Sequence, residues 1–530
     1  MAAAKAPSSL HPAAIAARTP ERPALTLDGE CWRYGELESR ANRLAHALRA
    51  AGLGTGDGIA VLLGNQLEMF VAYWAAQRIG LYFTPISTQL KSAEIAWIVA
   101  ASRARALISA DDFLPRLDPI AEGLPPLRLL VQGTGSTPAP WQALNGFVAN
   151  HPASFPEDAC EGAPLLFSSG TTGRPKGVIN VRPGAAPGTI GELARRRMAL
   201  HGIDADTVYL STAPLYHSAP LRYTEMVLRQ GGHCVIMEKF DAALALAMIE
   251  RHRITHSQWV PTMFVRLLRL PEAVQSRHDL SSLRYAIHAA APCPPAVKRA
   301  MLDWWGPILH EYYSATEANG QTVIGPQEWL AHPGSVGRPL LGRVRIRDAA
   351  GRDLPPFEHG LVYLDGGARF EYLDDPEQTA AAYADDGLST LGDIGYLDED
   401  GYLYLTDRRD FTIITGGVNV YPREVEDVLL THPDVMDAAV FGLPDSEFGE
   451  RVHAVVEATP GLAGNAALAA RLEVFCREHL AHLKCPRSFE FRETLPRLPT
   501  GKLAKGALRQ SVLEHQSHGL EATFPRPRVQ

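Results

Sequence analysis

Apolar residues recur with helical spacing and then in short unbroken runs through the first half of the chain. Residues 39–57 carry leucines and alanines three and four positions apart, which predicts an amphipathic helix that stops at Gly52. The run GIAVLLGN that follows has the continuous apolar character of a buried strand. Residues 68–86 and 93–110 repeat this order of helix and strand. Such alternation predicts parallel sheets with helices packed on their faces.

The pattern changes in the last third of the chain. From about Gly334, short runs separated by many turn residues predict a small β-rich subdomain. After Asp410, a helix, a strand and another helix at about 468–480 predict a small α+β domain. The predicted fold class is α/β, with a large N-terminal domain of several subdomains and parallel-sheet layers over residues 1–409. A small C-terminal domain is predicted over residues 410–530.

Composition and charge narrow the classes of function. The 530 residues are 46% hydrophobic and 21% charged, as in ordinary soluble proteins, and the net charge of -8 indicates no surface for nucleic acid or anionic membrane. Six cysteines without a CxxC pair and histidines without an HExxH motif predict neither a disulfide framework nor a bound transition metal. No signal-peptide core or membrane-spanning run is apparent, so the sequence predicts a cytoplasmic protein, with a homodimer left open.

A loop rich in glycine and hydroxyl side chains, SSGTTGRPKGV, spans 168–178. Glycines let the backbone approach a ligand closely, hydroxyls and free N–H groups donate to oxyanions, and Lys176 adds a positive charge suited to phosphate. These features predict that the loop binds a polyphosphate. The Walker A pattern does not fit, because Pro175 precedes the lysine where that pattern has Gly, and Gly177 follows it where Ser or Thr is needed.

The stretch SSGTTGRPKG resembles the phosphate loop of acyl-adenylate-forming enzymes, which include acyl-CoA synthetases, aryl-CoA ligases, luciferases and the adenylation domains of peptide synthetases. The resemblance covers nearly the whole chain. Four more motifs follow in the order of that family: YYSATE, STLGDIGYLDEDGYLYLTDR, DRRDFTIITGGVNVYPREVE and PRLPTGKLAKGALR. Ser314 and Phe411 depart mildly from the family pattern. The resemblance implies that the loop residues that bind ATP are Ser168, Ser169, Gly170, Thr171, Thr172, Gly173 and Lys176.

The same resemblance implies roles for residues of the other motifs. Tyr313 would stack on adenine, Thr316 would contact phosphate, and Glu317 would bind Mg²⁺, for which a carboxylate is a suitable oxygen ligand. Asp393 would hold the ribose hydroxyls, and Arg408 would also reach the nucleotide.

The resemblance also implies a mobile C-terminal domain that pivots at Asp410. Lys502 would be the adenylation lysine, with Lys505 as the nearby alternative. Gly416 and Gly417 would let the pantetheine arm of CoA pass close to the backbone. The implied acyl pocket consists of His217, Trp259, Ala289, Ala290 and Ala291. Core packing is the alternative role for Trp259 and the three alanines.

The implied function is that of an AMP-forming acyl-CoA synthetase, with Lys502, Lys176, Glu317 and His217 as catalytic residues. Its substrates would be ATP with Mg²⁺, a carboxylic acid and coenzyme A. The stretches VYLSTAPLYHSAPLRY and EYYSATE resemble those of bacterial CoA ligases for fatty, bile-acid and steroid side-chain acids, which implies a fatty or bulky alicyclic or steroid-type acid. A monocarboxylate is expected, because no charged residue could be placed beside the acid to bind a second carboxylate. The alternatives are an adenylation domain that loads a carrier protein, an aryl-acid CoA ligase, a luciferase-like oxygenase and a non-catalytic nucleotide-binding protein.

Overall fold

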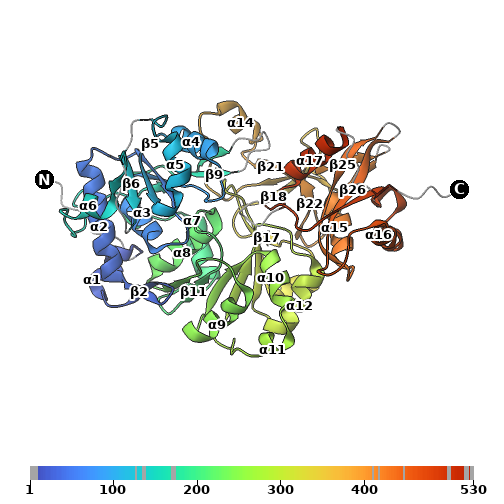
Figure 1. The fold of residues 1–530 in the computed structure, drawn as a ribbon, viewed down its shortest axis with the longest axis horizontal. Coiled ribbons are helices and arrows are strands. Elements are labelled where there is room, and N and C mark those ends of the chain that lie inside the picture. The colour runs from blue at the N-terminus through green and yellow to red at the C-terminus, as the bar shows by residue number, and fades with distance from the viewer. Residues whose placement is uncertain are drawn as a thin grey trace.

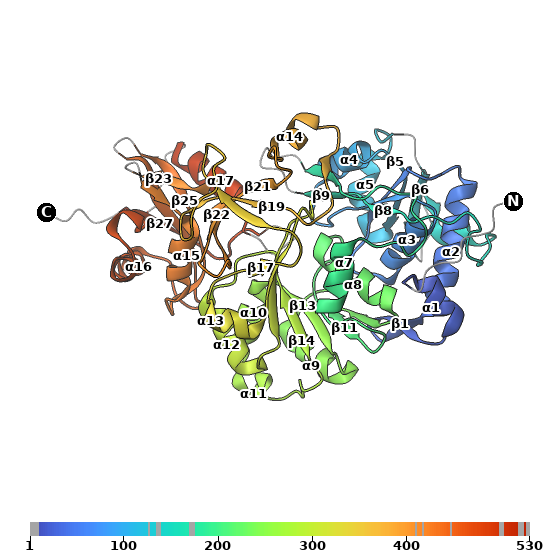
Figure 2. The same cartoon turned by 180° about the vertical axis from the view of Figure 1, so that it is seen from behind.

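The computed structural model describes residues 10–125, 128–133, 139–168, 175–408, 411–415, 418–445, 448–497, 503–517 and 524–525. Within these residues, large β-sheets with helices on their faces form the body of the molecule, and a smaller unit made by the end of the chain lies beside it (Figure 1). The same division is visible from behind (Figure 2). The α/β fold predicted from the sequence is confirmed.

The first large sheet takes its strands from widely separated parts of the chain. Its strand order is β17-β16-β15-β14-β13-β11-β12-β1-β2. Its central strands run parallel from β1 to β15, and β2, β16 and β17 are antiparallel additions at the edges. The strands are β1 (Pro23–Leu27), β2 (Glu30–Arg33), β11 (Val208–Ser211), β12 (His233–Ile236), β13 (His256–Trp259), β14 (Tyr285–His288), β15 (Leu309–Tyr313), β16 (Thr322–Ile324) and β17 (Arg338–Pro339).

The second large sheet is parallel throughout, with the order β7-β6-β5-β3-β4-β8. All five residues of β3 are buried, as expected for a strand covered on both faces. The strands are β3 (Gly58–Leu62), β4 (Tyr82–Pro85), β5 (Ala104–Ala110), β6 (Arg128–Gln132), β7 (Gln142–Ala143) and β8 (Ala163–Pro164). One hydrophobic core is shared by both large sheets, since it joins Leu25 and Tyr209 of the first to Ile59 and Phe83 of the second.

Smaller antiparallel sheets complete the body. One has the order β20-β10-β9, formed by β9 (Leu166–Ser168), β10 (Lys176–Ile179) and β20 (Glu371–Tyr372). The other has the order β18-β19-β21-β22, formed by β18 (Val344–Arg347), β19 (Gly360–Leu364), β21 (Ser389–Leu397) and β22 (Leu403–Arg408). The second of these is the β-rich subdomain that the sequence predicts after Gly334.

The C-terminal unit has its own sheet and its own hydrophobic core. Its strands follow the order β24-β23-β26-β27-β28, and β25 pairs with β26. The strands are β23 (Ile413–Thr415), β24 (Val418–Val420), β25 (Val435–Asp445), β26 (Gly449–Ala458), β27 (Ser488–Arg492) and β28 (Phe524–Pro525). Its helices are α15 (Pro422–Leu430), α16 (Ala466–His479) and α17 (Lys505–Ser517). The α+β character predicted for this part of the chain is confirmed.

The remaining helices connect the strands of the body. They are α1 (Pro12–Arg18), α2 (Tyr34–Ala50), α3 (Leu67–Arg78), α4 (Ser92–Ala101), α5 (Leu114–Ala121), α6 (Leu144–Val148), α7 (Glu192–Leu200), α8 (Ser218–Gln230), α9 (Ala242–His252), α10 (Pro261–Leu268), α11 (Glu272–Gln275), α12 (Pro295–Trp305), α13 (Pro326–Ala331) and α14 (Pro376–Ala381). Helix α2 begins earlier than the apolar pattern predicts, because Tyr34 is buried and its hydroxyl donates to the main-chain oxygens of Leu228 and Gly232 at 3.1 and 2.8 Å.

Buried ion pairs join the helices of the two large sheets. Arg229 of α8 pairs with Glu161 in the segment before β8 and, at 2.8 Å, with Glu225 of its own helix. Nearby, Arg78 of α3 pairs with Glu38 of α2 at 2.6 Å. Each of these guanidinium groups is almost fully buried and faces a carboxylate, which compensates for the loss of hydration.

Helix α2 ends at the glycine that the sequence indicates. Gly52 has a φ of +89°, in the left-handed region. Its N–H donates to the carbonyl of Arg49 at 2.8 Å, and the N–H of Leu53 donates to that of Leu48 at 3.1 Å. This pair of hydrogen bonds is the Schellman motif, which requires a left-handed residue where glycine carries no steric penalty.

We therefore expect Gly52→Ala to lower the free energy of unfolding by about 1 kcal/mol, because alanine is strained in the left-handed region. Gly54→Ala is the matched control: its backbone lies outside that region, and an added Cβ would meet no heavy atom within 4 Å. This control should leave stability unchanged or slightly raised. Denaturant unfolding of both variants checks the difference, and equal effects would contradict it.

Candidate functional site

The short strand β10 brings Lys176 beside two other strands. It pairs with β9, where Lys176 lies opposite Ser168, and with β20, where Val178 lies opposite Tyr372. The ammonium of Lys176 is 5.7 Å from the centre of the Tyr372 ring, within the range of a cation–π contact. Two of the predicted loop residues, Ser168 and Lys176, are thus held by strand pairing. Ser169, Gly170, Thr171, Thr172 and Gly173 lie outside the described residues.

Glu317 lies in a turn just after β15 and is tied to the strand that carries Lys176. Its side chain is buried, with 7% of the residue exposed, and its Oε1 accepts a hydrogen bond from the Tyr372 hydroxyl at 3.0 Å. The Asn180 amide donates to the main-chain oxygens of Thr316 and Glu317 at 3.2 and 3.3 Å. These contacts join the phosphate-loop and YYSATE motifs, which are distant in sequence.

Tyr313 and Asp393, which the sequence assigns to adenine and ribose, touch each other. The Tyr313 hydroxyl donates to Oδ2 of Asp393 at 2.5 Å. Asp393 lies on β21, directly opposite Arg408 of β22. The side chain of Arg408 is not among the described parts of the structure, but its backbone position places it next to the predicted ribose carboxylate. Three residues from two motifs therefore gather at one place.

His217 and the alanine segment follow the carboxyl ends of the parallel strands β11 and β14, which lie on either side of β13. His217 immediately precedes α8 and packs its ring edge-on against Tyr216 at 4.6 Å. Ala289, Ala290 and Ala291 follow β14, and Ala290 adopts a φ of +75°. A left-handed alanine is strained, and such strain is found where the surrounding structure demands a particular backbone path.

The side chain of Trp259 belongs to the core. It is 1% exposed, packs against Phe240, Phe264 and Trp305, and donates from its indole N–H to the Ser257 hydroxyl at 2.7 Å. Its main-chain oxygen accepts a hydrogen bond from the N–H of Ala289 at 3.4 Å. Of the two roles considered for Trp259, packing is favoured over a direct place in the acyl pocket.

A buried ion pair lies beneath the alanine segment and Tyr313. The Lys298 ammonium is fully buried and donates to Oε2 of Glu311 at 2.6 Å, and it also lies 4.8 Å from the centre of the Trp329 ring. Nε2 of His288 is 3.5 Å from the same carboxylate oxygen, too far for a strong hydrogen bond. Burial and then the Lys298 charge hold the pKa of His288 well below its ordinary value, so this imidazole is neutral.

Other predicted site residues lie outside the described part of the chain: Asp410, Gly416, Gly417 and Lys502. Lys505, the alternative to Lys502, is described at the start of α17. Its ammonium pairs with Glu426 at 2.8 Å and is 12% exposed, so it serves the packing of the C-terminal unit. This engagement favours Lys502 as the lysine available for chemistry.

Sequence reasoning missed Tyr372 and Asn180. Asn180 could have been suspected, because it is a polar residue directly after the strand that carries Lys176. Tyr372 gives no such signal, since it reaches Glu317 only through the pairing of β20 with β10.

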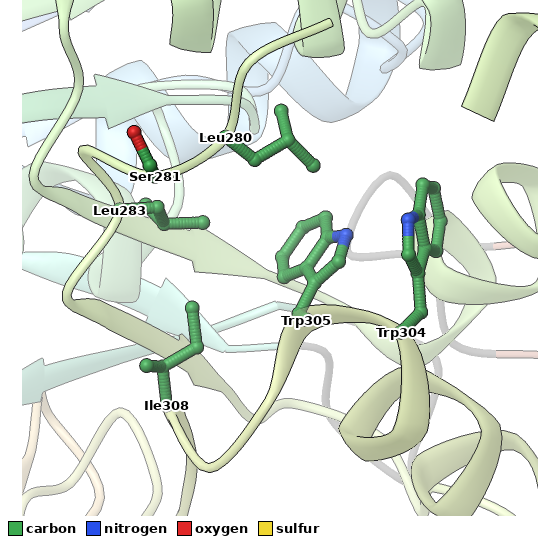
Figure 3. Close-up of a pocket in the computed structure, with 6 residues that line it drawn as sticks. All are labelled: Leu280, Ser281, Leu283, Trp304, Trp305 and Ile308. Atoms are coloured by element: carbon green, nitrogen blue, oxygen red, sulfur yellow. The ribbon is translucent and has the colours of Figure 1, made fainter. Parts of the chain in front are cut away.

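A hollow of about 360 Å³ lies elsewhere in the body, as Figure 3 shows. Its lining residues are Leu280, Ser281, Leu283, Trp304, Trp305 and Ile308. Leu283 lies two residues before β14 and Ile308 directly precedes β15, so the hollow lies at the amino ends of these strands. Ligands of parallel α/β sheets bind at the carboxyl ends, where Tyr313 and the alanine segment are found.

Two further properties concern the described residues only. No helix among them has the length and apolar character needed to cross a membrane. No group of three or more His, Cys, Asp or Glu side chains among them is arranged to hold a metal ion.

Comparison with known proteins supports an adenylate-forming site. The family model of the AMP-binding enzyme matches residues 13–371, and that of the AMP-binding enzyme C-terminal domain matches residues 424–502. Fatty acid–acyl-carrier-protein ligase ScoC of Streptomyces coeruleorubidus is 32% identical, over 92% of this chain and 93% of its own. A methyl-dioxo-octahydroindenyl-propanoyl:CoA ligase of Mycobacterium tuberculosis is 34% identical, over 93% and 96%.

A solved structure agrees with these matches. The o-succinylbenzoate CoA synthetase MenE of Bacillus subtilis, in complex with its acyl-adenylate intermediate, superposes with a TM-score of 0.79 at 28% identity. The superposition covers 95% of this chain and 98% of that one.

We predict that Tyr372→Phe slows acyl-adenylate formation by about tenfold, because Glu317 loses a hydrogen bond to its charged group while the ring beside Lys176 remains. Single-turnover adenylation at saturating ATP measures the effect. Tyr383→Phe is the matched control, since the Tyr383 hydroxyl contacts only main-chain atoms of Phe370 in the hydrogen bonds described. Equal losses in both variants would show that Tyr372 only supports the local fold.

We expect Lys298→Met to lower the free energy of unfolding by about 3 kcal/mol, because Glu311 is left buried without its counter-charge. The double change Lys298→Met with Glu311→Leu removes both charges and should recover most of that loss. Denaturant unfolding of the two variants provides the comparison. A double variant as unstable as the single one would assign the stability to packing of the lysine stem on Trp329.

Proposed function

The chain belongs to the AMP-binding enzyme family and is an AMP-forming acid–thiol ligase, and we propose that it converts a carboxylic acid, ATP and coenzyme A into an acyl-CoA. The observation that carries the proposal is the position of Tyr372. Its ring lies beside the Lys176 ammonium and its hydroxyl binds the Glu317 carboxylate. A cation for phosphate and a carboxylate for Mg²⁺ are thereby set close together.

The chemistry proposed for this site proceeds in two steps. A carboxylate oxygen of the acid attacks the α-phosphorus of ATP, the bond to the bridging oxygen breaks, and pyrophosphate leaves. The thiol sulfur of CoA then attacks the acyl carbon, AMP leaves, and the thiol proton passes to solvent. The first step concentrates negative charge on the α-phosphate, which Lys176 and Lys502 would stabilise.

Magnesium would arrive with ATP as part of the substrate. The residues present fit it, because Glu317 offers a buried carboxylate whose position is fixed by Tyr372 and by the turn that Asn180 holds. When bound, the ion supplies charge neutralisation for the phosphates. Tyr313 and Asp393 would hold the adenine and ribose of the same nucleotide.

The acceptor and the acid are finer points of the proposal. The coenzyme A ligase of Mycobacterium tuberculosis and MenE favour a CoA thiol, whereas ScoC favours a carrier-protein thiol. We retain CoA as the acceptor, with Gly416 and Gly417 beside its pantetheine arm. The relatives act on fatty, alicyclic and aryl acids, and this variety favours no single class of acid. We therefore retain the monocarboxylate predicted from the sequence.

We also propose that the C-terminal domain, residues 410–530, turns about Asp410 between the two steps. Lys502 is needed in the first step and the Gly416–Gly417 face in the second, and one rigid domain cannot present both faces to the same site. We also propose that the protein is cytoplasmic, as the sequence predicts.

Pyrophosphate release that depends on both an acid and ATP tests the function itself. A panel of acids is offered with CoA and, separately, with a carrier protein, and the thioester products are identified by mass spectrometry. Oxygen uptake or light would support the luciferase-like alternative. Absence of acid-dependent pyrophosphate release across the panel would leave only the non-catalytic nucleotide-binding alternative.

We predict that Lys502→Ala reduces acyl-adenylate formation by about 100-fold or more, because a preorganised charge at the α-phosphate is lost. The variant should still convert a supplied acyl-adenylate and CoA to thioester. Lys505→Ala is the matched control and should retain adenylation, because Lys505 pairs with Glu426. Equal losses of both half-reactions in Lys502→Ala would contradict its proposed role.

A further inference from the structure

Helices α7 and α8 bring two arginines together next to the proposed acyl site. The two helices lie side by side in both views of the molecule (Figures 1 and 2). Arg197 is on α7 and Arg222 is on α8. Their charges are close enough that the Arg222 guanidinium, after burial, helps to lower the pKa of Arg197 to about 10. Arg197 is therefore positively charged at neutral pH.

Arg222 is connected to the residues of the nucleotide site. It lies one helical turn beyond Ser218, whose hydroxyl accepts from its Nε at 3.3 Å, and His217 immediately precedes that turn. Its Nη2 is 3.4 Å from Oδ1 of Asn180. Asn180 also donates to the main-chain oxygens of Thr316 and Glu317, so Arg222 is connected through Asn180 to the turn that carries Glu317.

Arg197 lies deeper, next to Tyr312. Its Nε is shielded from solvent and makes no hydrogen bond within the described part of the chain. The Tyr312 phenol, which both arginine charges influence, accepts a hydrogen bond from the Gln258 amide at 3.3 Å. Gln258 directly precedes Trp259 on β13, and Tyr312 directly precedes Tyr313 on β15. The charge of Arg197 thus lies near Tyr312, close to the carboxyl ends of β13 and β15 where the proposed acyl site is built.

No carboxylate among the described residues forms an ion pair with Arg197 or Arg222. The fully buried arginines behave differently: Arg78 faces Glu38, and Arg229 faces Glu161 and Glu225. Both arginines are half-buried, and like charges held near each other in a partly desolvated place are unfavourable unless an anion joins them. A planar guanidinium binds a carboxylate through two parallel hydrogen bonds, so a carboxylate suits this pair.

We propose that Arg197 and Arg222 bind a second carboxylate of the acid substrate, so that the enzyme activates dicarboxylic acids at the carboxylate nearer Lys176. This inference rests on the proposed function and names its substrate class. It replaces the monocarboxylate expected from the sequence, which followed from finding no charged residue to place beside the acid.

The experiment compares acids that differ only in the distal carboxylate. Suitable pairs are adipate with hexanoate, suberate with octanoate, and 4-(2-carboxyphenyl)-4-oxobutanoate with 4-oxo-4-phenylbutanoate. The ratio of kcat/KM for diacid over monoacid is measured by pyrophosphate release. In the wild type, at least one pair should favour the diacid by about 100-fold or more, because a site built for a polar group strongly rejects the analogue that lacks it.

Arg197→Met and Arg222→Met should each reduce this ratio by about tenfold or more, since a charge-assisted contact is lost. Arg196→Met is the matched control on the same helix. Arg196 is exposed, pairs with Glu192 at 3.0 Å, and should leave the ratio unchanged. Equal losses with diacids and monoacids, accompanied by a higher KM for ATP, would overturn the proposal and assign the arginines to phosphate. A wild type that prefers every monoacid would also overturn it.

A binding measurement separates this inference from the proposed function. Without ATP, at least one of the three diacids should raise the Tm of the wild type and of Arg196→Met, and should do so much less for the double variant Arg197→Met with Arg222→Met. This result would support the arginine site even if no acid released pyrophosphate, an outcome that would reject the proposed function alone. If the diacid shifts the Tm of the double variant as much as that of the wild type, the arginines do not bind the second carboxylate.

Discussion

The position of Asn180 and Tyr372 on the two sides of one turn determines the geometry of the site. Asn180 holds the backbone of the turn, and Tyr372 holds the carboxylate that the turn carries. Tyr372 belongs to the small sheet that contains Lys176, and Asn180 directly follows the strand of that sheet that carries Lys176. These few hydrogen bonds link the phosphate loop to the strand ends of the first large sheet. They matter because catalysis depends on placing charges within a fraction of an ångström.

Buried and half-buried charges in this fold fall into two groups with different physical roles. Arg78, Arg229 and Lys298 each face a carboxylate, and their pairs join helices or support strands. Arg197 and Arg222 are half-buried on the adjacent helices α7 and α8, and the folded chain supplies no ion-pair partner for them among its described carboxylates. Paired charges specify how elements meet, whereas uncompensated ones mark a place where a ligand completes the electrostatics.

Local patterns predicted the fold well, because a helix or a buried strand is written in the spacing of neighbouring residues. The end of α2 at Gly52 follows from one glycine, and the unbroken apolar run of β3 follows from burial on both faces. Contacts between distant segments could not be predicted in this way. Tyr372 reaches Glu317 only because β20 pairs with β10, and Arg197 meets Arg222 only because α7 packs beside α8. Trp259 was ambiguous for the same reason, since its neighbours come from three separate segments.

The pairing of β10 with β20 has a consequence for how the chain is made. During synthesis, the segment with Lys176 leaves the ribosome long before Glu371 and Tyr372 have been added. The edge of β10 that pairs with β20 therefore stays unpaired during that time. Exposed strand edges are templates for wrong pairing, and contacts between distant residues form slowly. The nascent chain therefore carries this open edge through the translation of most of the first large sheet, and a translational pause in that interval lengthens the time available for misfolding.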